Sequence, residues 1–284
     1  MIYNTNYMNR FKKQTAVAII TCNREHVFKK CIDSIDRDAV DHIFVINAGD
    51  KYSEYPDDVT VIQPKRNPSP VGINKNIALR EMKNAGYDFL FLMEDDIKVI
   101  DNKAFEVYIE TAMDSGIWSG QLAFGLHGGY AAGNMNDDGT PKKKMSVQYT
   151  KHKVDFYHHG PHAFAIYHAN VLPHIGYFDE RFINSAEHLD QYLNSFYKNL
   201  GMPFWWFPDV YDSFNYLADV DENLNESVIR KQSDFAKNFS YSWGLFKEKH
   251  RFFPHEVPSS SPEEAHERME FLEKNYSQKH MLNQ

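Results

Sequence analysis

The start of the chain alternates unbroken apolar runs with segments in which apolar residues recur at helical spacing. The runs are rich in β-branched and aromatic side chains, which predicts strands buried on both faces of a sheet. They cover residues 15–20, 42–47, 59–63 and 87–93. Because strands that alternate with helices form parallel sheets, this pattern predicts an α/β fold with a mostly parallel, twisted sheet flanked by helices.

Two helices are expected between these strands. The first has apolar residues at helical spacing from Val27 onward, and Asn23 is its expected N-cap. The second is expected to be capped by Ser69, to carry Pro70 in its first turn and to end before Gly86.

Regular patterns are sparser in the rest of the chain. Helical spacing returns at 103–113 and, with a clear apolar face, at 187–200, and a short strand is expected at 163–167. The Gly- and Asn-rich stretch 125–139 predicts a long loop of the kind that often covers a binding site. A helix capped by Ser261 is expected near the C-terminus.

These patterns divide the chain into four parts. We expect an N-terminal lead at 1–14, one half of an α/β unit at 15–100, a second half at 101–216 and a mainly helical C-terminal extension at 217–284. A chain of 284 residues with 42% apolar side chains can bury a sizeable core, which excludes a disordered protein.

Charge and cysteine content narrow the class of protein. The sequence has 31 basic against 39 acidic residues and no basic stripe, so no nucleic acid partner is expected. The one cationic run, Lys142 to Lys144, is expected to be a solvated loop. Cys22 and Cys31 fall at core-like positions and predict reduced thiols in a cytoplasmic protein. The N-terminus lacks the apolar segment of a signal peptide, and no stretch approaches the roughly 18 apolar residues of a membrane span.

Three carboxylates directly follow the apolar run at 87–93. Glu94, Asp95 and Asp96 cannot all stay in an apolar interior, because like charges repel and each desolvated charge is costly. Ligands of open parallel sheets bind beyond the carboxyl ends of the strands, where these residues lie. A hard divalent cation held by one or two carboxylates and a diphosphate would suit them. Taken alone, the triplet is more typical of an acidic loop that ends a strand than of a binding site.

Other polar residues follow the two preceding long strands, and we expect them at the same edge of the sheet. They are Thr21, Asn23 and Arg24 after the first strand, and Asn47 and Asp50 after the second. Such side chains could hydrogen-bond a base and a ribose, with Arg24 near a phosphate, although each alone is an ordinary turn former or cap. Their convergence at one edge favours a binding site.

The helix at 187–200 begins with polar groups. Glu187, His188 and Asp190 lie on its polar side, opposite a stripe of Leu and aromatic residues. One of them could act as a general base that deprotonates an acceptor hydroxyl. The alternative is that the acids only complement the helix dipole.

Several other kinds of site are not expected. The sequence has no P-loop, no dinucleotide-binding fingerprint and no nucleophile elbow. His158, His159 and His162 cluster, but without the further cysteines or the second spaced pair that a zinc site needs.

Taken in order, these segments resemble the nucleotide-binding half of GT-A-fold glycosyltransferases, particularly glycosyltransferase family 2. The motifs are TAVAIITCNRE, HIFVINAGD, Gly72-x-x-x-Asn76, FLFLMEDDI and, further on, IGYFDERF at 175–182. The resemblance covers roughly residues 15–205 and rests on the order of five motifs. It implies that the half at 15–100 binds a nucleotide-sugar and that the half at 101–216 binds an acceptor.

The resemblance also implies a role for each matching residue. Thr21 and Asn47 would flank the base, and Glu94 would touch the ribose or the uracil. Asp96 would be the principal ligand of a divalent cation, Mn²⁺ or Mg²⁺, on the diphosphate. Asn76 and Asp95 would complete the donor side, and Asp179 and Glu180 would shape the acceptor side.

The sequence departs from the family pattern at the expected base. Glu187 and His188 align with a Glu–Asp pair whose Asp is usually the base, so the base is His188, Glu187 or Asp190. Asn47 stands where the family usually has Asp, which bears on the identity of the nucleotide. A distal His ligand of the metal is not evident, and Asp212 is a candidate for that position.

We therefore expect metal-dependent transfer of a sugar from a UDP-sugar to a hydroxyl acceptor, with inversion, in glycan or cell-surface polysaccharide synthesis. A sugar-1-phosphate nucleotidyltransferase is an alternative, but it needs a Gly-rich basic loop where this chain has TCNRE. A non-catalytic nucleotide- or glycan-binding module is a third hypothesis, because His188 replaces the usual base.

Overall fold

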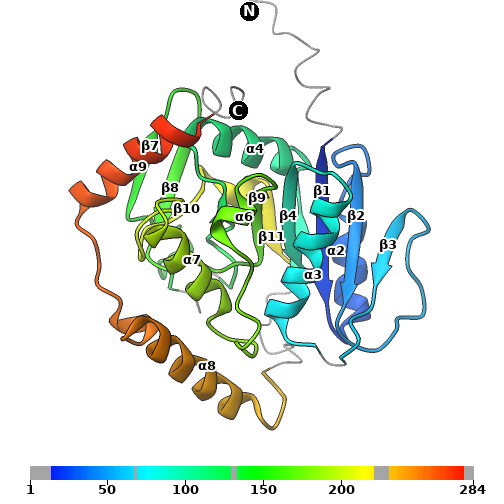
Figure 1. Ribbon diagram of the computed structural model, residues 1–284. Coiled ribbons are helices and arrows are strands. Elements are labelled where there is room, and N and C mark those ends of the chain that lie inside the picture. The colour runs from blue at the N-terminus through cyan, green and yellow to red at the C-terminus, as the bar shows by residue number, and fades with distance from the viewer. Residues whose placement is uncertain (1–13, 67–68, 129–132, 221–229, 278–284) are drawn as a thin grey trace, which may run out of the picture.

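The computed structural model describes residues 14–66, 69–128, 133–220 and 230–277 (Figure 1). Its centre is a six-stranded sheet in the order β3-β2-β1-β4-β9-β6. Four neighbouring strands run parallel: β3 (Val59–Ile62), β2 (His42–Asn47), β1 (Thr15–Thr21) and β4 (Phe89–Glu94). β9 (Phe164–His168) is antiparallel to β4 and to the edge strand β6 (Ser119–Ala123). The expected lead at 1–14 lies, except for Gln14, outside the described residues.

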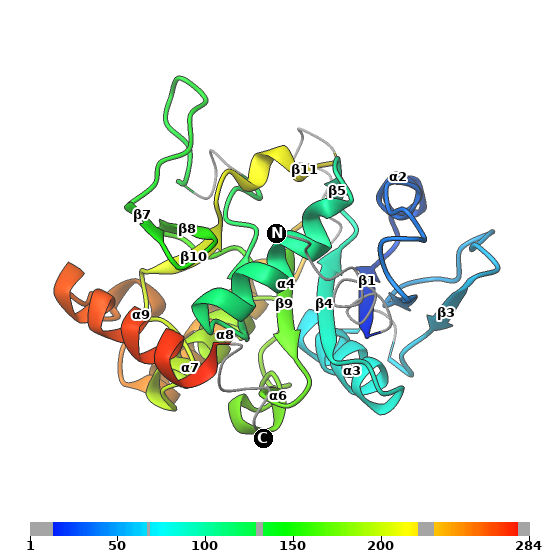
Figure 2. The same cartoon turned by 90° about the horizontal axis from the view of Figure 1, so that it is seen from above.

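Helices cover both faces of this sheet. Figure 2 shows α2 and α4 on one face and α3 and α6 on the other. Their bounds are α2 (Glu25–Asp33), α3 (Val71–Asn84), α4 (Lys103–Ser115) and α6 (Leu172–Ile175). α2 buries Val27, Phe28, Cys31 and Ile32, which recur at helical spacing and therefore share one face of the helix.

A second, smaller sheet lies beside β6 and has the order β10-β8-β7. Its strands are β7 (Met145–Gln148), β8 (Lys153–Tyr157) and β10 (Phe207–Val210), and all pairings are antiparallel. A two-stranded ribbon joins β5 (Ile97–Val99), just after the carboxylate triplet, to β11 (Leu217–Asp219), which follows a short 3-10 helix, η1 (Ser213–Asn215).

The remaining elements are helical and lie far from β3, the strand at the parallel edge of the six-stranded sheet. They are α7 (Glu187–Tyr197), α8 (Phe235–His250), the 3-10 helix η3 (Pro254–Glu256) and α9 (Pro262–Tyr276). α8, η3 and α9 account for most of the described residues after 230. None of the helices in the described parts of the chain combines the length and the apolarity needed to cross a membrane.

The expected strands of the first half are confirmed. Three of them are buried runs, and all seven residues of β1 are buried. The edge strand β3 has only four residues, and none of them is fully buried. The helix at 103–113 and the strand at 163–167 are confirmed as α4 and β9. Four strands of the second half were not expected. β7 exposes alternate residues and β10 contains Pro208 and Asp209, so neither has the apolar run on which the expectation depended.

Both expected helix caps near the sheet edge are wrong. α2 begins at Glu25 with Arg24 at the N-cap, while Asn23 adopts a left-handed φ of 53° and accepts a hydrogen bond from the Asp50 amide at 2.7 Å. α3 begins at Val71 with Pro70 at the N-cap, and Ser69 makes no cap. The cap at Ser261 is confirmed, since its hydroxyl accepts from the Glu264 amide at 3.2 Å.

The lysine run at 142–144 is not a freely solvated loop. Lys143 Nζ lies 2.7 Å from both Asp155 and Asp212, and Lys144 donates to the Trp205 carbonyl at 3.0 Å. Asp155 is wholly buried, so it needs a nearby positive charge to offset the loss of water.

Candidate functional site

The register of the sheet brings the carboxyl ends of three strands together. Thr21 pairs with Asn47 across β1 and β2, and Ile20 pairs with Glu94 across β1 and β4. The backbone amide of Asp95 continues this pairing by donating to the Ile20 carbonyl at 3.1 Å. The residues that follow the apolar runs therefore meet at one edge, as expected from a parallel sheet.

Arg24 joins two of the three carboxylates. Its guanidinium contacts Asp95 and donates to Asp96 Oδ2 at 3.1 Å. The Thr21 hydroxyl donates to the second oxygen of Asp95 at 2.6 Å, and it also lies 2.5 Å from the Tyr52 hydroxyl. Asp95 is fully buried, and its two partners are the last residue of β1 and Arg24 just beyond it.

The two aspartates differ in their electrostatics. Burial raises the pKa of Asp95 to about 7, although the charge of Arg24 opposes that rise. Burial would also raise the pKa of Asp96, but the positive charges of His127 and Arg24 outweigh it and hold this pKa below its ordinary value. Asp96 is therefore the carboxylate that stays ionised over the wider range of pH.

His127 is a charged neighbour that sequence reasoning missed. Its Nδ1 lies 2.7 Å from the Asp219 carboxylate, and Asp219 lies on β11, opposite Ile97 on β5. Burial alone would lower the pKa of His127, but Asp219 and Asp96 overcome it and raise the pKa to about 9. The pairing of β11 with β5 brings Asp219, and with it His127, close to the carboxylate triplet. No local sequence motif indicates this pairing.

One carboxylate oxygen of Asp96 is in an environment that favours a bound cation. Its Oδ1 is buried and has no hydrogen-bond partner among the described residues, whereas its Oδ2 accepts from Arg24. A carboxylate oxygen without a donor is costly unless a cation or a ligand reaches it. Within the described residues, however, no three His, Cys, Asp or Glu side chains are grouped to hold a metal by themselves. A cation here would have to take further ligands from a bound phosphate.

Two of the residues expected to contact a nucleoside form hydrogen bonds to other residues of the protein instead. Asn47 is buried; its amide donates to the Asp50 carbonyl at 2.8 Å and to the Tyr55 hydroxyl at 2.7 Å. The Asn47 carbonyl oxygen in turn accepts from the Gly49 amide. Asn23 is similarly engaged with the amide of Asp50. These residues shape the loops after β1 and β2.

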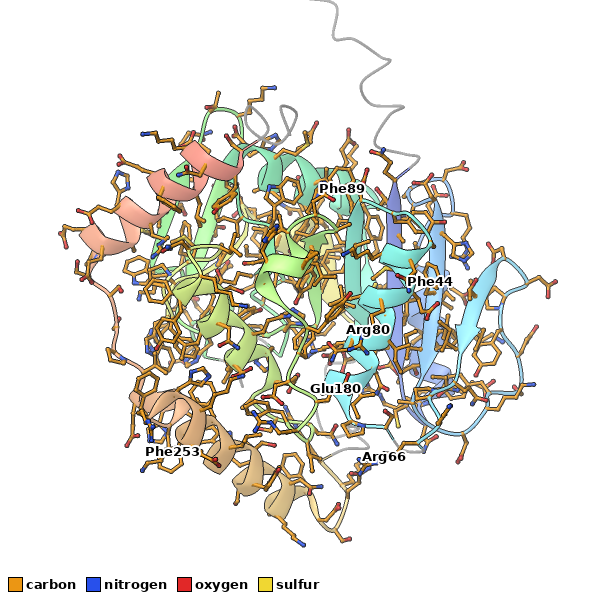
Figure 3. All side chains as sticks on the ribbon, in the orientation of Figure 1. Phe44, Arg66, Arg80, Phe89, Glu180 and Phe253 are labelled. Atoms are coloured by element: carbon orange, nitrogen blue, oxygen red, sulfur yellow. The ribbon has the colours of Figure 1, made fainter. Side chains whose placement is uncertain are left out.

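Asn76 joins α3 to the segment that carries the YFDERF sequence. It donates to the Phe178 carbonyl and to Glu180, both at 2.9 Å, and it accepts from the Phe178 amide at 2.8 Å. Glu180 also pairs with Arg80 at 3.3 Å, and Figure 3 shows these two side chains together beside α3. Asn76 thus holds two walls of the site together.

A pocket of about 300 Å³ opens directly at the carboxyl edge. Thr21, Arg24, Glu94 and Asp95 line it, together with residues from the start of α3, from the loop before α7 and from the start of α8. Arg66 also lines it, and Figure 3 shows this side chain beyond the carboxyl ends of the strands. Sequence reasoning missed Arg66 because it follows the edge strand β3 by several residues and belongs to no motif.

A buried lysine, also missed, connects this pocket to α7. Lys75 is 1% exposed, and its Nζ lies 3.1 Å from Glu94 and 3.3 Å from Glu187. Burial would raise the pKa of Glu187, but Lys75 and His188 outweigh it and hold the pKa below its ordinary value. Glu187 is therefore an ionised, buried group rather than a solvated helix-end acid.

The other two candidates on α7 differ sharply in environment. Asp190 is 1% exposed and is engaged by His250 at 2.7 Å and Lys249 at 2.8 Å, both from α8. His188 is partly exposed, and its Nδ1 lies 3.4 Å from Glu187. Both acids were expected on the polar side of the helix. They are buried because Lys75 of α3 contacts Glu187, and Lys249 and His250 of α8 contact Asp190.

Asp212, the candidate for a distal metal ligand, takes part in an ion pair within the protein. It sits at the N-cap of η1 with a φ of 52°, and its carboxylate pairs with Lys143 at 2.7 Å. Its backbone amide donates to the buried Asp155. This ion-paired cluster accounts for the Asp212 side chain without a metal.

Comparisons with known proteins identify the fold. No protein-family model and no curated protein sequence matches the chain. The mannosyltransferase PcManGT from Pyrobaculum calidifontis, in complex with GDP-Man and Mn²⁺, is structurally similar with a TM-score of 0.50 and 10% identity, over 91% of this chain and 69% of that chain. GalNAc-T7 with UDP, GalNAc and Mn²⁺ is similar with the same TM-score and identity, over 96% of this chain and 57% of that chain. The chain thus has the α/β fold of GT-A glycosyltransferases, with a mostly parallel sheet flanked by helices.

Proposed function

We propose that this protein is a glycosyltransferase that transfers a sugar from a UDP-sugar to a hydroxyl acceptor, with inversion and with a divalent cation. The observation that carries the proposal is the unpartnered Oδ1 of Asp96 at the carboxyl edge of a GT-A-type sheet. Its chain neighbour Asp95 lines the pocket at the same edge. Both similar structures contain Mn²⁺, one with GDP-mannose and one with UDP, which supports a nucleotide-sugar and a cation.

The proposed donor contacts are Asp96 and residues that line the pocket. Asp96 would hold Mn²⁺ or Mg²⁺ through Oδ1, with diphosphate oxygens as further ligands. When bound, the cation offsets the negative charge that develops on the departing diphosphate. Arg66 makes no ion pair with any described residue, so its charge is available for the same phosphates. Thr21 and Glu94 are the proposed contacts of the nucleoside.

For the acceptor side, we assign the general base to His188 supported by Glu187. His188 is the most exposed of the three candidates, and ionised Glu187 beside its Nδ1 would orient the imidazole. Asp190 is engaged by Lys249 and His250 of α8, so it serves packing in this account.

The proposal is tested by nucleotide release from UDP-glucose, UDP-galactose, UDP-N-acetylglucosamine and GDP-mannose, with Mn²⁺ and a mixture of glycan acceptors. We expect release for at least one donor, and its loss in Asp96→Ala together with loss of Mn²⁺-dependent UDP binding measured by calorimetry. His188→Ala should bind UDP as the parent does but turn over about 100-fold more slowly.

The exposed Asp137→Ala is the matched control, and circular dichroism checks the fold of each variant. If Asp96→Ala binds UDP with Mn²⁺ and turns over like the parent, the assignment of the cation is wrong. If the parent binds no nucleotide at all, the proposed function is wrong.

A further inference from the structure

We propose that the start of α8 completes a subsite for the sugar of the donor, and that Gln232 and Asn238 select which sugar is accepted. This inference rests on the proposed function, since it names a part of the same donor pocket. Gln232, Asp234 and Asn238 line the pocket, although they lie more than a hundred residues beyond the carboxylate triplet. Neither Gln232 nor Asn238 has a side-chain partner among the described residues, so both amides can serve a ligand.

Two buried polar atoms opposite α8 lack partners. Ser69 is 5% exposed and Asn74 is 1% exposed, and both residues line the pocket. The Ser69 hydroxyl oxygen and Asn74 Oδ1 have no hydrogen-bond partner among the described residues. Buried polar groups of this kind are costly unless a ligand satisfies them, because each loses its hydrogen bonds to water.

The chemistry of these groups matches a polyhydroxylated ring. A serine hydroxyl both donates and accepts, Asn74 Oδ1 accepts only, and the free amides of Gln232 and Asn238 do both. Sugar hydroxyls likewise donate and accept, so a sugar can satisfy all four groups together. None of these four groups carries a charge. The one charged residue that α8 adds to the lining is the acidic Asp234 at its N-cap, whereas Arg24 and Arg66 are basic.

The lining argues for a sugar rather than a base. Among the described residues that line the pocket, none has an aromatic ring, and its apolar contacts are small or aliphatic, such as Ala48, Pro70 and Val71. A nucleobase is usually bound by stacking on an aromatic or guanidinium plane. The four uncharged groups of Ser69, Asn74, Gln232 and Asn238 offer hydrogen bonds but no such plane.

The position of α8 is fixed by the protein rather than by the ligand. The Ser242 hydroxyl accepts from the Ile183 amide at 2.9 Å, and the neighbouring Asn184 accepts from the Val71 amide at 3.0 Å. α8 is thereby connected, through the loop before α7, to the start of α3, where Ser69 and Asn74 lie. Figure 1 shows α8 below α7, on the side of the sheet where the parallel strands end. The two walls of the subsite are thus preorganised.

The test compares binding of nucleoside diphosphates with binding of complete donors. Calorimetry with Mn²⁺ would measure UDP, GDP, UDP-glucose, UDP-galactose and GDP-mannose against the parent, Asn238→Ala and Ser69→Ala. We expect both variants to bind the preferred nucleotide-sugar five- to tenfold more weakly and to bind the free diphosphate within twofold of the parent. Gln232→Ala should change the ratio of affinities among the sugars of one nucleotide.

Ser240→Ala is the matched control, because Ser240 is exposed on α8 and does not line the pocket. Equal weakening of the diphosphate and of the complete donor would overturn the inference in favour of a nucleoside subsite. Unchanged binding of both would also overturn it. In either case the parent protein still binds nucleotide, so the proposed function stands. If the parent protein binds no nucleotide, both the inference and the proposed function are wrong.

Discussion

Arg24 and the carboxylates that it contacts set the charge at the centre of the site. One guanidinium satisfies Asp95 and one oxygen of Asp96, while the other oxygen of Asp96 has no partner among the described residues. A positive side chain therefore lies where a divalent cation would need negative charge. The arrangement suits a site that takes its cation together with a diphosphate rather than alone.

Removal of this guanidinium should strengthen the binding of the cation to the free protein. In Arg24→Met the two aspartates lose their counter-charge, so we expect Mn²⁺ to bind without nucleotide about tenfold more tightly, or by ~1.4 kcal/mol. Calorimetry or the electron paramagnetic resonance signal of free Mn²⁺ measures this. Arg37→Met, which removes a surface pair with Asp58, is the control and should change nothing. Unchanged or weaker Mn²⁺ binding in Arg24→Met would contradict the account.

The sequence allowed the acidic triplet and its neighbours to be placed at one edge, because strand ends of a parallel sheet coincide. It did not allow the contacts between them to be foreseen. Arg24 and Asp95 are 71 residues apart, and their contact depends on how the loop after β1 turns. His127 was missed for the same reason, since its partner Asp219 comes from a strand too short to predict.

Three elements meet at Lys75: α3 supplies it, β4 ends at Glu94, and α7 begins at Glu187. A lysine with two carboxylates, buried between elements, ties the donor pocket to the helix that carries the proposed base. Lys75 occupies an ordinary polar position in the helical pattern of α3, so its burial could not be predicted from the sequence. Elements with continuous apolar runs were predicted well, whereas such polar contacts between elements were not.

Loss of this lysine should destabilise the fold strongly at neutral pH. The lowered pKa of Glu187 means that its pairing stabilises the native state above the ordinary carboxyl pKa and is lost as the pH falls through the lowered value. In Lys75→Met an unpaired buried carboxylate remains, which costs about 3–5 kcal/mol. We expect this deficit at pH 7 to shrink towards pH 4, where Glu187 can protonate.

Urea unfolding of the parent, Lys75→Met and Lys75→Arg at both pH values measures this effect. Lys75→Arg keeps the charge and should recover part of the stability. A deficit in Lys75→Met that is the same at pH 7 and pH 4 would show that the ion pairs are not its cause.

At the scale of the whole molecule, the C-terminal extension is fastened to the second half of the α/β unit. The indoles of Trp205 and Trp206 donate to the carbonyls of Val257 at 2.7 Å and Ser260 at 3.1 Å. Lys249 and His250 hold α8 to Asp190 on α7. Because the start of α8 also lines the pocket, this part of the extension contributes to the candidate site.

Weakening the link at Asp190 should loosen α8 selectively. In Asp190→Asn the charge that holds Lys249 and buried His250 is lost, so we expect a loss of about 2 kcal/mol in the stability of α8. Hydrogen exchange measured by mass spectrometry should show faster exchange in α8, while α9 and β1 keep the protection of the parent. Equal acceleration throughout the chain, or none in α8, would contradict this role of Asp190.

The central claim is that a nucleotide and a divalent cation bind together at the carboxyl edge of the sheet. The most direct measurement is a crystal structure of the parent protein soaked with UDP and Mn²⁺. We expect Mn²⁺ to contact Asp96 Oδ1 and the diphosphate, with the diphosphate in the pocket lined by Arg24, Arg66 and Glu94. Nucleotide bound elsewhere, or bound at this edge with no cation contact to Asp96, would contradict the account.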